Sequence, residues 1–144
     1  KRQAFILDCV PSQSNGLTFC TGSLGANVAN HVPQIATRFA DKIHFAHLRN
    51  VSNYPDGSFM EAAHLDGDVD MVAVVEVLLR EQKRRKEAGR KDWRIPFRPD
   101  HGHELLDDVN KPTHPGYPAI GRLRGLAEIR GVMTAVAKMH NLPT

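Results

Sequence analysis

Hydrophobic and polar positions alternate along the chain in blocks that predict three strands, each followed by a helix. The predicted strands are short β-prone runs bounded by turn-forming residues, at 16–20, 42–48 and 95–98. The predicted helices carry apolar residues at helical spacing, at 30–40, 68–88 and 119–140. This alternation favours a parallel sheet with right-handed crossovers. Three such units cannot close a barrel, so the pattern predicts a small open sheet or part of a (β/α)₈ barrel of about 250 residues.

The ends of these helices are marked by capping and breaking residues. Asn30 is expected to cap the first helix, and Asp68 or Asp70 to start the second. Gly89 should end the second helix, since glycine is the usual residue after a helix C-terminus. The third helix is expected to be broken or kinked near Gly131.

The segment 49–67, between the second strand and the second helix, is predicted to be a loop. It holds a cluster of turn formers, Asn53, Pro55, Asp56 and Gly57. Because it is longer than most loops of compact domains, the prediction is a functional or disordered segment.

Composition is that of an ordinary globular domain. The chain has 144 residues, 41% apolar and 24% charged, enough for one domain with one core. It has no apolar run of about 18 residues, so we expect no membrane span and no membrane partner. Two cysteines do not make a disulfide framework, which favours a reduced cytoplasm. The chain starts without Met, and we expect it to be a piece of a longer protein.

The net charge of +3 and the sequence pI of about 9.1 raise the question of nucleic-acid binding. The positive charge is concentrated at 83–86 and 90–91, near one predicted helix end. Cations there complement the helix dipole and are solvated. No nucleic-acid-binding signature accompanies them, so a solvated helix face is the preferred interpretation and no nucleic-acid partner is expected.

Three chemically reactive side chains stand where the three predicted strands end. Cys20, His47 and Asp100 supply a thiolate, an imidazole and a carboxylate. In parallel α/β folds the active site lies at the carboxyl ends of the strands. A divalent metal is therefore considered, since it would offset the cost of gathering such groups. Each residue also has a structural alternative, as a buried small hydrophobe, a core histidine or a turn former.

Candidate proton-transfer and binding residues lie next to these strand ends. His101 is placed to act on substrate protons, and Tyr117 could donate to a leaving group. Arg49 could hold a carboxylate with two hydrogen bonds, or be a surface cation. His103 is expected to contact the residues of the site without binding the metal itself. Gly102 is expected to allow a sharp turn between the two histidines.

With these residues in place, the sequence resembles the mannonate dehydratase family over nearly its whole length. The stretches that carry the resemblance are NGLTFCTGSLG at 15–25, HFAHLRNV at 44–51, EAAHLDGDVDM at 61–71, RPDHGH at 98–103 and NKPTHPGYPAIGR at 110–122. The ordered set is specific. The resemblance implies a (β/α)₈ TIM barrel of the xylose-isomerase-like kind, of which this chain would be roughly the C-terminal half or less.

The resemblance also implies the chemistry. Members dehydrate D-mannonate to 2-keto-3-deoxy-D-gluconate in glucuronate catabolism, with Mn²⁺ or, alternatively, Fe²⁺. Cys20, His47 and Asp100 match the family's metal ligands. A further His ligand on an earlier strand of the family has no counterpart in this sequence. His101 and Tyr117 match positions linked to catalysis.

Several roles and alternatives stay open at this level. Arg49 lies in a His-x-Arg-Asn motif of the family, without a settled role. One of His101 and Tyr117 would be the base, and the other would assist the leaving hydroxyl. A homo-oligomer is expected for the full-length enzyme. The alternatives are a metal-dependent sugar isomerase or epimerase on the same barrel, an inactive fragment, and a basic binding module.

Overall fold

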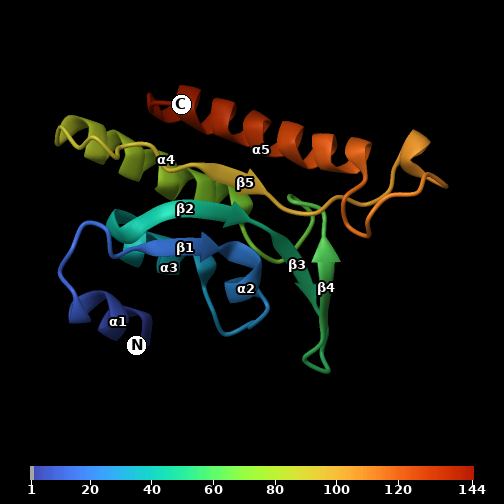
Figure 1. The fold of residues 1–144 in the computed structure, drawn as a ribbon, viewed down its shortest axis with the longest axis horizontal. Coiled ribbons are helices and arrows are strands. Elements are labelled where there is room, and N and C mark those ends of the chain that lie inside the picture. Colours follow the sequence, from blue (N-terminus) through green and yellow to red (C-terminus); the bar gives the residue numbers. More distant parts are fainter. Residues whose placement is uncertain (1) are drawn as a thin grey trace.

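A three-stranded parallel sheet forms the centre of the fold in this computed structural model, which describes residues 2–144 (Figure 1). Its strands are β1 (Leu17–Cys20), β2 (Ile43–Leu48) and β5 (Phe97–Pro99), in the order β1-β2-β5. Cys20 pairs with His47, and His47 pairs with Arg98. The predicted parallel sheet is therefore confirmed, and β1, β2 and β5 end at the same edge.

Helices flank this sheet without enclosing it (Figure 1). They are α1 (Arg2–Cys9), α2 (Thr21–Gly25), α3 (Val32–Phe39), α4 (Met71–Glu87) and α5 (Ala119–His140), with short 3-10 turns at Ala40–Lys42 and Leu106–Asp108. Helix α5 lies against α4, and α3 packs on the other side of α4 (Figure 1). The core joins sheet and helices through buried apolar side chains such as Phe19, Ala46, Leu48, Val74, Val75, Leu78 and Ile129. No helix among residues 2–144 is both long enough and apolar enough to cross a membrane.

The segment predicted as a loop contains an antiparallel hairpin instead. Strands β3 (Asn50–Asn53) and β4 (Phe59–Ala62) pair, and the hairpin extends beyond the carboxyl end of β2 (Figure 1). The buried Asn50 amide fixes its base, donating to the carbonyls of His64 at 2.9 Å and Val69 at 3.0 Å. These bonds span 14 and 19 positions, so local sequence pattern could not reveal them.

The start of α3 differs by one residue from the prediction. The cap is His31, whose Nδ1 accepts from the Gln34 amide at 3.3 Å. The Asn30 side chain instead donates to the Leu24 carbonyl at 2.9 Å and ties α2 to the loop that follows it. Asp70 caps α4 as one of the two predicted residues, through the Ala73 amide.

Two other boundaries were wrong. Helix α5 runs without a break through Gly131, because a single glycine lowers helix propensity but removes no backbone hydrogen bond. Strand β5 begins at Phe97, after Pro96, rather than at residue 95. Proline has no N–H to donate to a ladder, and the Ile95 amide donates to the Gln82 side chain instead.

The basic run at the end of α4 is partly buried, which corrects its interpretation as a wholly solvated face. Arg85 is fully buried and donates to Glu81 Oε1 at 2.7 Å and to the carbonyls of Ala40 and Ile43 at 2.8 Å each. Burial by itself would raise the pKa of Glu81, but hydrogen bonds from Arg84 and Arg85 hold that pKa below its ordinary value. The guanidinium therefore joins α4 to the start of β2.

Helix α5 approaches the chain after β5 at very short range. A Cβ on Gly121 would overlap the His103 carbonyl, and a Cβ on Gly102 would overlap the backbone of Gly121 and Arg122. Gly102 does not have a positive φ, so the predicted sharp turn is not the reason for glycine here. Glycine is needed because two backbones touch.

Replacing Arg85 by Met should destabilise the fold. The change leaves buried Glu81 without its buried partner and two carbonyls without their donor, so we expect the free energy of unfolding to fall by about 3 kcal/mol. Urea denaturation followed by circular dichroism measures it. The matched control is Arg84→Met, because Arg84 is 55% exposed and also pairs with Glu81. Its loss should be about 0.5 kcal/mol, and equal losses would contradict the assignment.

Alanine at Gly121 should also destabilise, since its Cβ meets backbone that cannot rotate away. We expect a fall of about 2 kcal/mol or more in unfolding free energy, the range for overpacked sites. Gly131→Ala in the same helix is the control, because an added Cβ there meets nothing within 4 Å. It should stabilise by about 0.5–1 kcal/mol through helix propensity. Thermal melts of both variants test the opposite signs.

Candidate functional site

The ends of the three parallel strands bring Cys20, His47 and Asp100 together. Cys20 is the last residue of β1, His47 lies beside it on β2, and Asp100 follows β5. Cys20 Sγ lies 3.4 Å from His47 Nδ1, and His47 Nε2 lies 2.9 Å from Asp100 Oδ1. The three residues thus form a row of contacts, with the imidazole between the thiol and the carboxylate.

The environments of these groups suit ligand atoms. Cys20 Sγ accepts from the Ser23 amide at 3.4 Å and from the Ser23 hydroxyl at 3.2 Å, so two donors face the sulfur. Asp100 is 5% exposed, and its Oδ2 is buried without a hydrogen-bond partner. A buried carboxylate oxygen of this kind is stabilised by a nearby cation or by water.

Arg49 supplies one such cation at the same edge. Its Nε lies 3.4 Å from Asp100 Oδ2 and also donates to Glu61 Oε2 at 3.0 Å, and its terminal nitrogen pairs with Glu61 Oε1. The Thr21 hydroxyl fixes the Arg49 backbone on both sides, accepting from its N–H at 2.8 Å and donating to its carbonyl at 2.6 Å. The hydrogen bond with Glu61 raises the pKa of Arg49.

His101 and Tyr117 form a pair on the solvent side of Asp100. The His101 Nε2 and the Tyr117 hydroxyl are 3.3 Å apart, and their rings meet edge to face at 5.0 Å. The guanidinium of Arg122 lies 5.2 Å from the centre of the Tyr117 ring. His101 Nε2 is 3.7 Å from Asp100 Oδ1, and its side chain is 40% exposed. A proton could pass between this pair and a substrate at the strand ends.

The loop that carries this pair is held by α5. Asp108 is buried, and its carboxylate accepts from the amides of Ile120 at 3.1 Å and Gly121 at 2.8 Å, at the first turn of α5. Burial would raise the pKa of Asp108, but these backbone hydrogen bonds hold it below the ordinary value. The exposed His103 contacts Gly121 of α5 through its backbone carbonyl.

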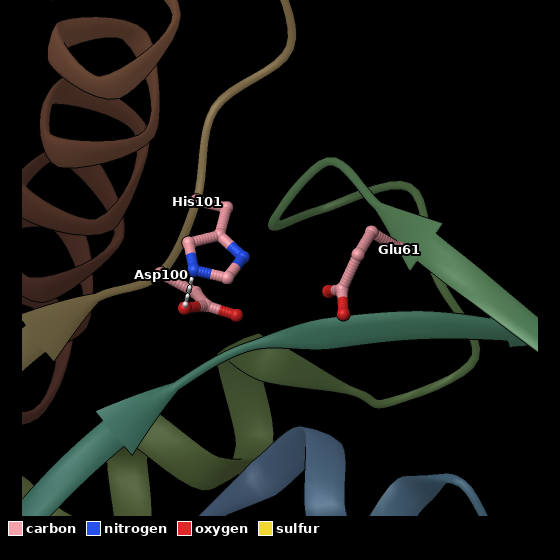
Figure 2. Close-up of side chains that lie close together, drawn as sticks. All are labelled: Glu61, Asp100 and His101. Carbon is pink, nitrogen blue, oxygen red and sulfur yellow. Dashed lines mark ion pairs between the residues drawn. The ribbon is translucent and has the colours of Figure 1, made fainter. Parts of the chain in front are cut away.

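Two residues that sequence reasoning did not single out lie at the site. Glu61, on β4, offers a carboxylate oxygen that falls within 4.8 Å of ligand atoms of both Asp100 and His101 (Figure 2). His64 is buried and accepts the Asp100 N–H on its Nε2 at 3.0 Å. Burial holds the pKa of His64 below its ordinary value. Glu61 and His64 reach the site because the β3–β4 hairpin returns the chain towards the strand ends. The sequence pattern of residues 49–67 predicted a loop and did not indicate this return.

Comparison with known proteins gives one family. The family model described as "D-mannonate dehydratase (UxuA)" matches residues 2–142. The chain is 56% identical over 137 residues to the mannonate dehydratase of Rhizobium meliloti (strain 1021), covering 93% of this chain and 34% of that protein. It is 57% identical over 132 residues to mannonate dehydratase 1 of Agrobacterium fabrum, covering 90% of this chain and 33% of that protein.

A solved structure agrees with these relatives. The crystal structure of mannonate dehydratase from Streptococcus suis serotype 2 superposes with a TM-score of 0.78 at 30% identity, over 96% of this chain and 37% of that one. The chain spans about a third of the length of the curated relatives it matches. The matched family model and the superposed fold cover the sheet and the strand-end residues together. This chain belongs to the D-mannonate dehydratase family.

Proposed function

We propose that this chain forms the metal-binding and proton-transfer part of an enzyme that dehydrates D-mannonate to 2-keto-3-deoxy-D-gluconate. The observation that carries the proposal is the row Cys20–His47–Asp100 at adjacent strand ends, with the His101–Tyr117 pair beside it. Family membership supplies the substrate. The proposal extends to the complete (β/α)₈ barrel, a homo-oligomeric full-length enzyme and a cytoplasmic location.

The residue types at the strand ends are ones that bind divalent metals, and Asp100 also belongs to a group with Glu61 and His101 whose ligand atoms lie within 4.8 Å of one another. His47 Nε2 and Asp100 Oδ1 are 2.9 Å apart, close enough to serve one ion. Cys20 Sγ lies 3.4 Å from the other ring nitrogen of His47, Nδ1, so we propose that Cys20 joins the same ion after a rotation of its side chain or of the imidazole. The buried Asp100 Oδ2 accepts no hydrogen bond and lies 3.4 Å from Arg49 Nε, so it stays available as a ligand to a further cation. Mn²⁺ is proposed, with Fe²⁺ as the alternative. When bound, the ion supplies positive charge that polarises substrate oxygens and stabilises charge formed beside the substrate carboxylate.

His101 and Tyr117 are proposed to move the protons of the reaction. The dehydration removes a proton from the carbon beside a carboxylate and expels the neighbouring hydroxyl. At 3.3 Å from each other, the imidazole and the phenol can share a proton, so one accepts it from carbon and the other supplies it to the departing hydroxyl. The order of the two roles is left open.

Arg49 is proposed to orient the substrate carboxylate. A guanidinium has five N–H donors, and Glu61 engages two of the nitrogens, so further donors stay available. The Thr21 hydroxyl bonds both the N–H and the carbonyl of Arg49, so the Arg49 side chain starts from a fixed backbone position at the strand edge. Its positive charge, next to Asp100 Oδ2, also offsets repulsion between an acidic substrate and the site carboxylates.

Removal of a proposed ligand should remove metal and activity together. Asp100→Asn and His47→Ala in the longest natural form of the protein are expected to weaken Mn²⁺ binding by more than about 100-fold. Metal content by plasma mass spectrometry and formation of the 2-keto-3-deoxy acid are measured side by side. Asp66→Asn, whose side chain is 69% exposed, is the matched control and should keep both. Normal turnover of a metal-free ligand variant would contradict the proposal, as would isomerised sugar in place of the keto acid.

Loss of the Tyr117 hydroxyl should lower the rate without loss of metal. We expect Tyr117→Phe to reduce kcat by about 10²–10⁴-fold, the usual contribution of a proton-transfer group, and His101→Gln to do the same. Steady-state kinetics and metal analysis on the same preparations measure the two effects. Tyr54→Phe, on the hairpin turn, is the matched control and should leave kcat unchanged. A Tyr117→Phe enzyme with wild-type kcat would exclude Tyr117 from the chemistry.

A further inference from the structure

His64 makes a contact with Asp100 that lies outside the reacting groups. It follows β4 and is 4% exposed, yet its Nε2 accepts the backbone N–H of Asp100 at 3.0 Å. The same N–H also reaches the Leu48 carbonyl at 3.2 Å, so it is shared between β2 and the imidazole. The segment after the hairpin therefore holds the residue at the end of β5 by its main chain.

The other ring nitrogen of His64 faces α5. Because Nε2 accepts a hydrogen bond, a neutral imidazole carries its proton on Nδ1. A Cβ on Gly125 would overlap the Cε1 and Nδ1 atoms of His64, so the helix backbone is directly against that edge of the ring. The Nδ1–H donor therefore faces α5 and the small cavity beside it.

Glu128, one turn further along α5, can satisfy that donor. Its Oε1 accepts from Arg124 at 2.6 Å, while its Oε2 is buried and has no hydrogen-bond partner. A cavity of about 20 Å³ is lined by His64, Gly125 and Glu128 among others. That volume has room for one water molecule between an N–H donor and a carboxylate acceptor.

We propose that His64 is a positioning residue for Asp100, linked through Nδ1–H and one water molecule to the Glu128 carboxylate. The link runs from α5 to the main chain of Asp100 and sets where its carboxylate stands between His47 and Arg49. The inference rests on the proposed function, in which Asp100 binds the metal. Removing a group that holds a metal ligand in place commonly lowers metal affinity by about 10–100-fold.

This role is tested by titrating Mn²⁺ into the metal-free full-length protein. His64→Leu should weaken Mn²⁺ binding by about 10–100-fold, because the Asp100 N–H keeps only its longer bond to Leu48. His64→Gln should restore most of the affinity, since an amide oxygen can accept the same N–H while the amide NH₂ donates towards Glu128. A purely space-filling role would remove this ranking, because His64→Leu would then bind Mn²⁺ as well as His64→Gln. His140→Leu, at the other end of α5, is the control.

A second pair of variants covers the case in which His64→Leu does not fold. Glu128→Leu removes the acceptor on α5 and should weaken Mn²⁺ binding, whereas Glu128→Gln keeps an acceptor and should bind nearly as the wild type. Wild-type affinity in His64→Leu or in Glu128→Leu would overturn the inference and leave the proposed function intact. A wild-type protein that binds no Mn²⁺ would overturn both.

Discussion

The parallel register of β1, β2 and β5 ends the three strands at one edge of the sheet, and the site depends on this constraint. Cys20 and His47 are register partners, and Asp100 follows directly after the strand paired with β2. Residues far apart in the chain thereby meet as a row of thiol, imidazole and carboxylate. Parallel ladders hold backbones at fixed spacing, so the side chains need little further ordering to face one another.

Gathering carboxylates at this edge creates an electrostatic cost that Arg49 partly offsets. Asp100 and Glu61 would repel each other, and the guanidinium lies against both. The Thr21 hydroxyl fixes the Arg49 backbone, and β4 delivers Glu61 from the other side. Asp100 Oδ2 accepts no hydrogen bond, although Arg49 Nε lies 3.4 Å away, and it could therefore also bind a metal. Fold, charge balance and proposed chemistry are therefore parts of one arrangement.

Helix α5 acts as the support for the loop that follows β5. The Asp108 carboxylate accepts hydrogen bonds from amides in the first turn of α5. Gly102 and Gly121 allow the backbone of the loop to touch the backbone of α5. These contacts place His101 and Tyr117 3.3 Å apart beside Asp100. The His64 link would add a third connection, from the same helix to the main chain of Asp100. Precise placement of this loop thus comes from backbone contacts as much as from side chains.

The sequence by itself determined the strand–helix alternation, the parallel sheet, and the position of Cys20, His47 and Asp100 at strand ends, because apolar periodicity and turn residues are local signals. The sequence also indicated the Asp70 cap and the candidates His101 and Tyr117. Tertiary structure decided the β3–β4 hairpin, the burial of Arg85, the unbroken α5, and the places of Glu61 and His64. Each of these depends on partners many positions away, such as Asn50 with Val69 or Arg85 with Ile43, and local patterns do not encode such pairings.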